Sequence, residues 1–271
     1  MVSAAEIAAA AADIVALRRA TPEHMPEPLR LETALTLCQR AGYTPDDWQQ
    51  RALSSSARQI ALKCPRQTGK SLVASVLAAQ QAIYQPGSLV LVLSVGDRQA
   101  GELFKRVAEL YRGIGRPVSP DAETTRRIEL TNGSRILALP GKEATIRGFP
   151  SVSLAIIDEA ARVPDDLYYA IRPMLAVTGG RLVLLSTPFG KRGFFYEAWE
   201  NGGKEWDRFE IKVEQCPRLT PEFLASEKRS MPDFWYRQEY GGEFIDSIDS
   251  PFNPDAIEHM FSDPSVKPLF G

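Results

Sequence analysis

The chain has 271 residues, with 32 lysines and arginines against 34 aspartates and glutamates, so its formal net charge at pH 7 is −2. Size and composition indicate an ordinary globular protein, with one large domain or one domain and a small appendage. The charge excludes a global basic field, so a grip on nucleic acid would need a local patch or several subunits around the polymer. Three scattered cysteines argue against a disulfide framework and for a reducing compartment, and two histidines near the chain ends argue against histidine-based catalysis.

The first forty residues predict two helices, over 4–19 and 29–41, separated by Pro26 and Pro28. The first is rich in alanine, is interrupted by acidic residues and has no basic leader, which does not fit a targeting signal. No apolar run approaches the length of a membrane span, so we expect no association with a membrane.

Residues 64–71, Cys-Pro-Arg-Gln-Thr-Gly-Lys-Ser, follow a short apolar run and precede a helical pattern over 72–83. Strand, tight loop and helix are the context of a phosphate-binding P-loop, whose backbone N–H groups face the phosphates. Lys70 would reach the β- and γ-phosphates, and the Ser71 hydroxyl would contact Mg²⁺. Only the first position of the motif departs, because Cys64 replaces glycine and requires an ordinary backbone conformation there.

Further along the chain, nearly continuous apolar runs predict buried strands over 88–94, 154–157 and 182–185. Asn132-Gly133 between two β-prone runs predicts a hairpin. The remaining predicted elements are a helix over 99–111 capped by Asp97, an alternating edge strand over 209–213, and short helices over 221–230 and 232–241. This alternation predicts an α/β fold with a mostly parallel sheet, on which ligands bind at the carboxyl ends of the strands.

Asp158 and Glu159 follow the apolar run 154–157, which makes a Walker B pattern. The first acid would hold Mg²⁺ through water, from a strand neighbouring the P-loop strand. The second would orient and polarise the attacking water.

Other candidates have a structural alternative beside the functional one. Ser186 and Thr187 follow the run 182–185 and either contact phosphate, catalytic water or Glu159, or form a simple turn. Arg66, inside the loop, reaches phosphate or an acid. Arg147 is presented to another subunit's γ-phosphate, or is a solvated loop arginine. Trp48-Gln49 is either an adenine contact or a core tryptophan beside a surface glutamine.

Taken together, these motifs resemble the ATPase domain of the large terminase subunit, the DNA-packaging motor of tailed bacteriophages. The resemblance spans roughly residues 43–246. The matching segments are Trp48-Gln49, the Walker A variant 66–71, Arg147-Gly148, the acidic segment 156–160, the coupling motif 186–188, and 235–240 with Glu243-Phe244. That family's Walker A motif often lacks its first glycine, as here.

The resemblance implies a P-loop NTPase of the ASCE or RecA-like type, with helices flanking a parallel sheet and a small C-terminal lid subdomain. It implies that ATP and Mg²⁺ are the cofactors and that the activity is hydrolysis of ATP to ADP and phosphate. Catalytic roles fall to Glu159, Arg147, Lys70 and Arg66. The implied nucleotide contacts are Trp48, Gln49 and residues 66–71, which include Gln67, Thr68 and Gly69. The implied coupling residues are Ser186 and Thr187. The implied metal-binding residues are Ser71 and Asp158.

The implied domains are an N-terminal helical segment (1–42), the ATPase core (43–205), the lid (206–246) and a linker (247–271) toward a nuclease domain. The chain ends about where that domain would begin, so we expect an ATPase fragment without endonuclease activity. The implied partners are double-stranded DNA, the portal protein and the small terminase subunit. The expected assembly is a homo-oligomeric ring on the portal, or a monomer in isolation, in the host cytoplasm and transiently docked on the procapsid.

Two alternatives remain at this point. A superfamily-2-like, nucleic-acid-stimulated ATPase or helicase shares the P-loop, the acid pair and a similar third motif, but should carry a second RecA-like domain. A regulatory module that binds nucleotide without hydrolysis would not need Lys70, Asp158 and Glu159 all to be intact.

Overall fold

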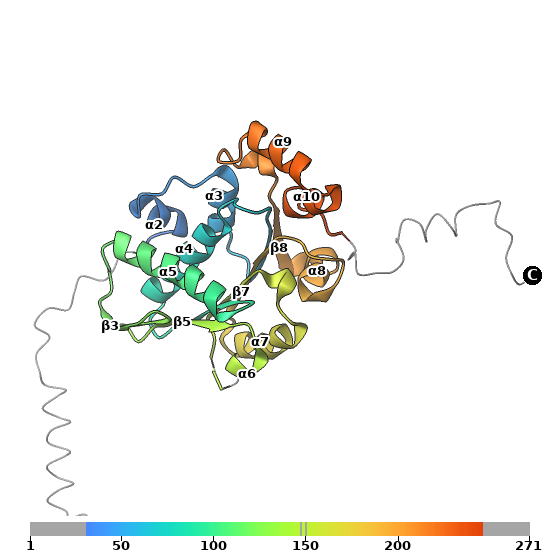
Figure 1. Ribbon diagram of the computed structural model, residues 1–271. Coiled ribbons are helices and arrows are strands. Elements are labelled where there is room, and N and C mark those ends of the chain that lie inside the picture. The colour runs from blue at the N-terminus through green and yellow to red at the C-terminus, as the bar shows by residue number, and fades with distance from the viewer. Residues whose placement is uncertain (1–30, 147, 150, 246–271) are drawn as a thin grey trace, which may run out of the picture. The chain divides into compact units, whose positions relative to one another are not determined.

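The computed structural model describes residues 31–146, 148–149 and 151–245 (Figure 1). Its centre is an eight-stranded sheet with the strand order β3-β4-β5-β2-β6-β7-β1-β8. The strands are β1 (Gln59–Lys63), β2 (Leu89–Ser94), β3 (Pro120–Glu123), β4 (Arg127–Leu130), β5 (Arg135–Pro140), β6 (Leu154–Asp158), β7 (Arg181–Ser186) and β8 (Trp206–Glu210).

Six of these strands, from β5 to β8 in the sheet order, run parallel, whereas β3, β4 and β5 pair antiparallel. Every residue of β2 and β6 is buried, because helices cover both faces of the parallel part. The mostly parallel α/β sheet predicted from the sequence is therefore confirmed.

Successive residues of a strand point to opposite faces of the sheet, and each face has its own hydrophobic core. On one face, Ile60, Leu62 and the residues of the other strands that point the same way pack against four helices. These are α2 (Ala34–Arg40), α3 (Asp47–Ser54), α4 (Lys70–Tyr84) and α5 (Asp97–Gly113). Ala61 and its counterparts pack on the other face against α6 (Glu143–Ile146), α7 (Asp165–Thr178) and α8 (Gly193–Glu200). Figure 1 shows the sheet between these two layers.

Beyond β8, the chain forms α9 (Pro221–Ser230) and α10 (Asp233–Glu239), which lie next to each other in Figure 1. Pro221 occupies the first helical turn of α9, and the Thr220 hydroxyl caps the helix by accepting from the Phe223 N–H. Short 3₁₀ turns connect the larger elements: η1 (Ala160–Arg162), η2 (Gly203–Glu205) and η3 (Val213–Gln215). No helix in the described ranges is long and apolar enough to cross a membrane.

Most predicted elements are confirmed, but several details differ. Gly96, not Asp97, is the cap residue of α5, and the Asp97 carboxylate pairs with Arg126 instead. The predicted edge strand 209–213 lies three residues earlier, as β8, and pairs with β1. This strand therefore belongs to the main sheet, although the lid was expected to begin at residue 206. The predicted helix 4–19 and linker 247–271 lie outside the described residues.

The order of the strands sets the geometry of the site. β7 lies between β1, which leads into the P-loop, and β6, which ends in the two acids. The expectation that the acids sit on the strand next to β1 was wrong, because one strand intervenes. All three strands nevertheless end at the same edge, where their loops meet.

Candidate nucleotide site

The loop between β1 and α4 has the features of a phosphate-binding loop. Gly69, the N-cap residue of α4, has a φ of +92°, a conformation that favours glycine. Cys64 is buried, and its backbone N–H donates to the carbonyl of Ser186 at 2.9 Å, which ties the loop entry to β7. Burial raises the pKa of the Cys64 thiol to about 12, so the thiol stays protonated at neutral pH.

The start of α4 leaves backbone donors free. Within the described part of the chain, the N–H groups of Gly69 and Lys70 have no acceptor. A helix N-terminus carries such unpaired donors and a partial positive charge, so it attracts anions. The loop can therefore receive phosphate oxygens without breaking bonds made by these two amides.

The two acids at the end of β6 have different environments. Asp158 is buried, and its Oδ1 has no hydrogen-bond partner. Glu159 is more exposed and has the left-handed backbone angles φ 53° and ψ 40°, which cost a non-glycine residue about 1–3 kcal/mol. The turn after Glu159 is held by the Ser186 hydroxyl, which accepts from the N–H of Ala161 at 3.1 Å.

Lys70 connects the P-loop with both acids across β7. Its Nζ forms an ion pair with the Glu159 carboxylate and lies 3.4 Å from Oδ1 of Asp158. Burial lowers the pKa of Lys70, but the two carboxylates outweigh it and raise the pKa above its usual value, so the ammonium stays charged. Burial raises the pKa of Asp158, and the nearby ammonium only partly opposes this.

The predicted coupling residues are buried at the end of β7. Ser186 is fully buried and Thr187 is 3% exposed. The Ser186 hydroxyl accepts from Ala161 and donates to the carbonyl of Thr187 at 2.7 Å. In this arrangement the Ser186 hydroxyl contacts the turn that carries Glu159, and the Ser186 carbonyl contacts the P-loop at Cys64.

The free N–H groups of Gly69 and Lys70 form the proposed phosphate-binding surface of the loop, which we call the phosphate cradle. Arg66 contacts α10 instead of this cradle. Its guanidinium pairs with the Glu239 carboxylate, and its N–H donates to the carbonyl of Glu239 at 2.9 Å. Arg162, from the turn after the acids, also reaches Glu239 at 3.4 Å and stacks over the Phe189 ring. No role was expected for Glu239, because only the fold brings α10 to the P-loop.

The predicted adenine motif lies beside the P-loop, but its side chains are already engaged. Trp48 is 1% exposed within the core, so we assign its indole a packing role in place of the expected nucleotide contact. Gln49 is 2% exposed; its Nε2 donates to the carbonyl of Gly69, and its Oε1 accepts from the N–H of Asp46. Contact with adenine would require Gln49 to leave both partners.

Arg147 lies outside the described residues. Ile146, the preceding residue, is buried in the core that includes Leu167 and Ile171 of α7. In the described ranges, no group of three or more histidine, cysteine, aspartate or glutamate side chains could hold a metal ion by itself.

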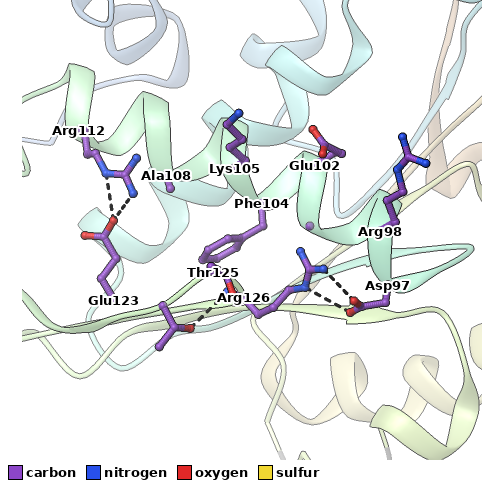
Figure 2. Close-up of a pocket in the computed structure, with 12 residues that line it drawn as sticks. Asp97, Arg98, Glu102, Phe104, Lys105, Ala108, Arg112, Glu123, Thr125 and Arg126 are labelled. Carbon is purple, nitrogen blue, oxygen red and sulfur yellow. Dashed lines mark hydrogen bonds and ion pairs between the residues drawn. The ribbon is translucent and has the colours of Figure 1, made fainter.

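A separate pocket of about 750 Å³ lies between α5 and the segment 123–126 (Figure 2). Arg126 pairs with Asp97 at one end, and Arg112 pairs with Glu123 at the other. Two basic side chains of α5, Arg98 and Lys105, line this pocket. Arg106 lies on the same helix, whereas Lys191 and Arg192 precede α8 on the opposite layer, so these basic residues do not form one patch.

Comparison with known proteins gives a consistent result. The family described as "Terminase large subunit, T4likevirus-type, N-terminal" matches residues 62–259. The chain is 29% identical over 249 residues to the terminase large subunit of Thermus phage G20c, covering 78% of this chain and 51% of that protein. The chain thus spans about half the length of the curated relatives it matches.

Two solved structures have the same fold. The large terminase ATPase domain of Thermus phage P74-26 is 25% identical, with a TM-score of 0.70 over 80% of this chain and all of that one. The large terminase of the thermophilic bacteriophage D6E, solved in complex with ADP, is 12% identical, with a TM-score of 0.65 over 74% of this chain and 54% of that one. The family match covers most of the chain, and the fold agrees with it: the chain belongs to the terminase large subunit family.

Proposed function

We propose that this chain binds ATP with Mg²⁺ and hydrolyses ATP to ADP and phosphate, as the motor domain that drives double-stranded DNA into a viral procapsid. The observation that carries the proposal is the meeting of Lys70, Asp158 and Glu159 at one edge of the sheet, beside unpaired N–H groups at the start of α4. Family membership supports the same activity, since structures of relatives are described as terminase ATPase domains.

The residues of the cradle fit a magnesium nucleotide. The free N–H groups of Gly69 and Lys70 suit phosphate oxygens. The buried Oδ1 of Asp158, which makes no hydrogen bond and lies 3.4 Å from the Lys70 ammonium, suits a cation held through water with the Ser71 hydroxyl. Bound Mg²⁺ would supply neutralisation of the charge that develops on the phosphate oxygens.

Glu159 would act as the general base that takes a proton from the attacking water. While its carboxylate pairs with the Lys70 ammonium, it is not free to orient an attacking water. Binding of a phosphate group gives Lys70 a competing anion, so Lys70 can turn toward it and release Glu159. Occupation of the cradle would thereby prepare the base for catalysis.

The remaining roles are more distant from the reacting atoms. Arg66 would contact phosphate after leaving Glu239, and Arg147 would act on a neighbouring subunit's γ-phosphate in a homo-oligomeric ring. Ser186 and Thr187 would couple the site to motion. The portal protein and the small terminase subunit would be partners on a procapsid in the host cytoplasm.

The test is ATPase turnover as a function of protein concentration, with and without double-stranded DNA. We expect Mg²⁺-dependent turnover that rises per subunit as the protein assembles, and that rises further with DNA. Nucleotide binding without turnover under all these conditions would contradict the motor function and leave a regulatory module. Failure to bind ATP or ADP at millimolar concentration would contradict the nucleotide site itself.

A further inference from the structure

Two consecutive carbonyl groups of the P-loop are held by side chains from outside the loop. The carbonyl of Thr68 accepts from Nη2 of Arg218 at 2.9 Å, and the carbonyl of Gly69 accepts from Nε2 of Gln49 at 3.1 Å. Arg218 lies in the segment between η3 and α9, whereas Gln49 lies on α3, so two distant parts of the chain meet on this loop.

Both side chains are anchored by one residue, Asp46, the N-cap residue of α3. Its carboxylate receives Nη1 of Arg218 at 3.2 Å and Nη2 at 2.5 Å, and its N–H donates to Oε1 of Gln49 at 2.9 Å. A forked guanidinium bound to a carboxylate is well fixed in direction, because two donors share one planar partner. Asp46, Gln49 and Arg218 therefore form one unit, which we call the carbonyl clamp.

Gly69 is the residue that lets the clamp approach the loop. A Cβ at this position would lie 2.8 Å from Nε2 of Gln49 and 3.2 Å from Nη2 of Arg218. The left-handed φ of Gly69 is equally unsuited to other residues. The glycine of the P-loop thus serves these side chains as well as the phosphate side.

The geometry of the peptide unit links the clamp to the phosphate cradle. In a trans peptide the carbonyl and the following N–H point in opposite directions. Holding the Thr68 and Gly69 carbonyls outward therefore directs the N–H groups of Gly69 and Lys70 to the other side, where neither has an acceptor in the described chain. A hydrogen bond to a carbonyl also polarises its peptide and makes the N–H a better donor.

We propose that Arg218 and Gln49, set by Asp46, are positioning residues that aim the N–H groups of Gly69 and Lys70 at the phosphates of the nucleotide. This rests on the proposed function, because it assumes that phosphates occupy the cradle. It also replaces the adenine role expected for Gln49, since both hydrogen-bonding groups of its amide serve the clamp.

The clamp and a base-reading role predict different ligand dependences. A clamp acts on phosphates, so its loss weakens ADP and inorganic tripolyphosphate alike and leaves the preference for ATP over GTP unchanged. A contact with adenine would change that preference and leave tripolyphosphate binding intact.

The experiment compares Arg218→Ala with Arg112→Ala in the full chain. Arg112 is a matched control, because it also pairs with a carboxylate, and its side chain is 49% exposed against 50% for Arg218. We expect Arg218→Ala to weaken ADP and tripolyphosphate binding by the same factor, roughly tenfold, as for a lost hydrogen bond to a charged donor. Arg112→Ala should bind both ligands like the unmodified protein.

Arg218→Lys should fall between the two, since lysine keeps one donor for the Thr68 carbonyl but loses the fork for Asp46. It also serves if Arg218→Ala does not fold. In both Arg218 variants we expect the KM for ATP to rise while kcat at saturation changes little, because phosphate binding is weakened uniformly.

Equal affinities in the Arg218 and Arg112 variants would overturn the proposal, as would a change confined to the ATP-to-GTP ratio. If the unmodified protein binds neither ADP nor tripolyphosphate, the proposed function fails first. That result is distinguishable, because it does not depend on any variant.

Discussion

At the scale of single residues, the two acids at the end of β6, Asp158 and Glu159, have different surroundings and therefore suit different roles. Asp158 is buried, with a side chain 12% exposed, whereas that of Glu159 is 29% exposed and pairs with Lys70. A buried carboxylate suits a fixed metal position, and a more accessible one suits exchange of protons with water. The two acids should therefore respond differently to loss of their charge.

Glu159→Gln should keep ATP binding and lose hydrolysis by about 10²–10⁴-fold, because the amide keeps the shape and cannot accept the proton. Binding is measured by titration with a fluorescent nucleotide, and turnover by phosphate release. Lys70→Ala is the contrasting variant, in which nucleotide affinity itself should fall. Hydrolysis at the unmodified rate by Glu159→Gln would remove this residue from the mechanism.

Asp158→Asn should raise the thermal stability of the nucleotide-free protein at pH 7. Burial raises the pKa of Asp158, so the folded state prefers the protonated acid, and ionisation costs stability as the pH rises through that pKa. Lys70 keeps its pair with Glu159 in the variant, so no lone charge is left behind.

The pH dependence checks this assignment. The Tm of Asp158→Asn should exceed that of the unmodified protein at neutral pH. The difference should shrink with falling pH and vanish only below about 4, the usual pKa of an unfolded aspartate, where the acid becomes protonated in both states. A constant difference over this range would show that the effect comes from packing and not from charge.

At the scale of elements, the end of β7 supports the turn that carries Glu159. The Ser186 hydroxyl accepts from the Ala161 N–H, and its removal leaves that partly buried donor without its partner, at a cost of about 1 kcal/mol. The strained backbone of Glu159 depends on such fixation. β7 can therefore transmit a shift of the turn to the P-loop, since the Ser186 carbonyl also holds Cys64.

Changing both Ser186 and Thr187 to alanine should spare ATP affinity and impair DNA-stimulated turnover. Ser134→Ala is a suitable control, because Ser134 is also fully buried and its hydroxyl accepts from the Ser88 N–H at 3.2 Å, far along the chain from the site. Both variants should lose stability. Equal loss of binding and turnover in the double variant would indicate a role in folding and not in coupling.

The elements that the sequence predicts best are those marked by a single clear sequence pattern. Continuous apolar runs gave β2, β6 and β7, and the Asn132-Gly133 turn gave the hairpin of β4 and β5. α7 was not predicted, since it carries Pro173 inside the helix, and β3 was not predicted, since it is short and polar.

Within the site, the P-loop and the acid pair were predicted because their residues are contiguous in the sequence. Arg218 and Glu239 lie more than a hundred residues from the P-loop, and no local pattern distinguishes them from surface charges. Only the fold brings them to the loop. Gln49 was singled out from the sequence as an adenine contact, whereas the partners of its amide could be found only from the structure.

At the scale of the whole molecule, the proposed motor needs contacts between copies. The α7 layer, next to Ile146, and the helices α9 and α10 lie at different ends of the described structure (Figure 1). Contact between two different surfaces of the same chain produces a ring or an open helix. Arg147 in trans would make hydrolysis depend on that assembly.

Arg147→Ala should bind ATP normally and hydrolyse it poorly at any protein concentration, because a finger of this kind contributes about 10³–10⁵-fold to kcat. Mixing it with Glu159→Gln should restore some turnover, since some interfaces then join an intact finger to an intact base. Turnover of the unmodified protein that stays flat while oligomers form, together with no rescue in the mixture, would place Arg147 in cis or outside the reaction.

The hydrogen bond from the Arg66 N–H to the carbonyl of Glu239 has a consequence for exchange with heavy water. A bonded amide hydrogen is replaced by deuterium only while its bond is open, so its rate reports the free energy of that opening. Arg66 belongs to the P-loop and Glu239 ends α10, so this one amide reports the fraction of time for which α10 is detached from the loop. Mass spectrometry of a peptide that contains Arg66, with and without nucleotide, would measure this local opening, which neither affinity nor turnover reveals.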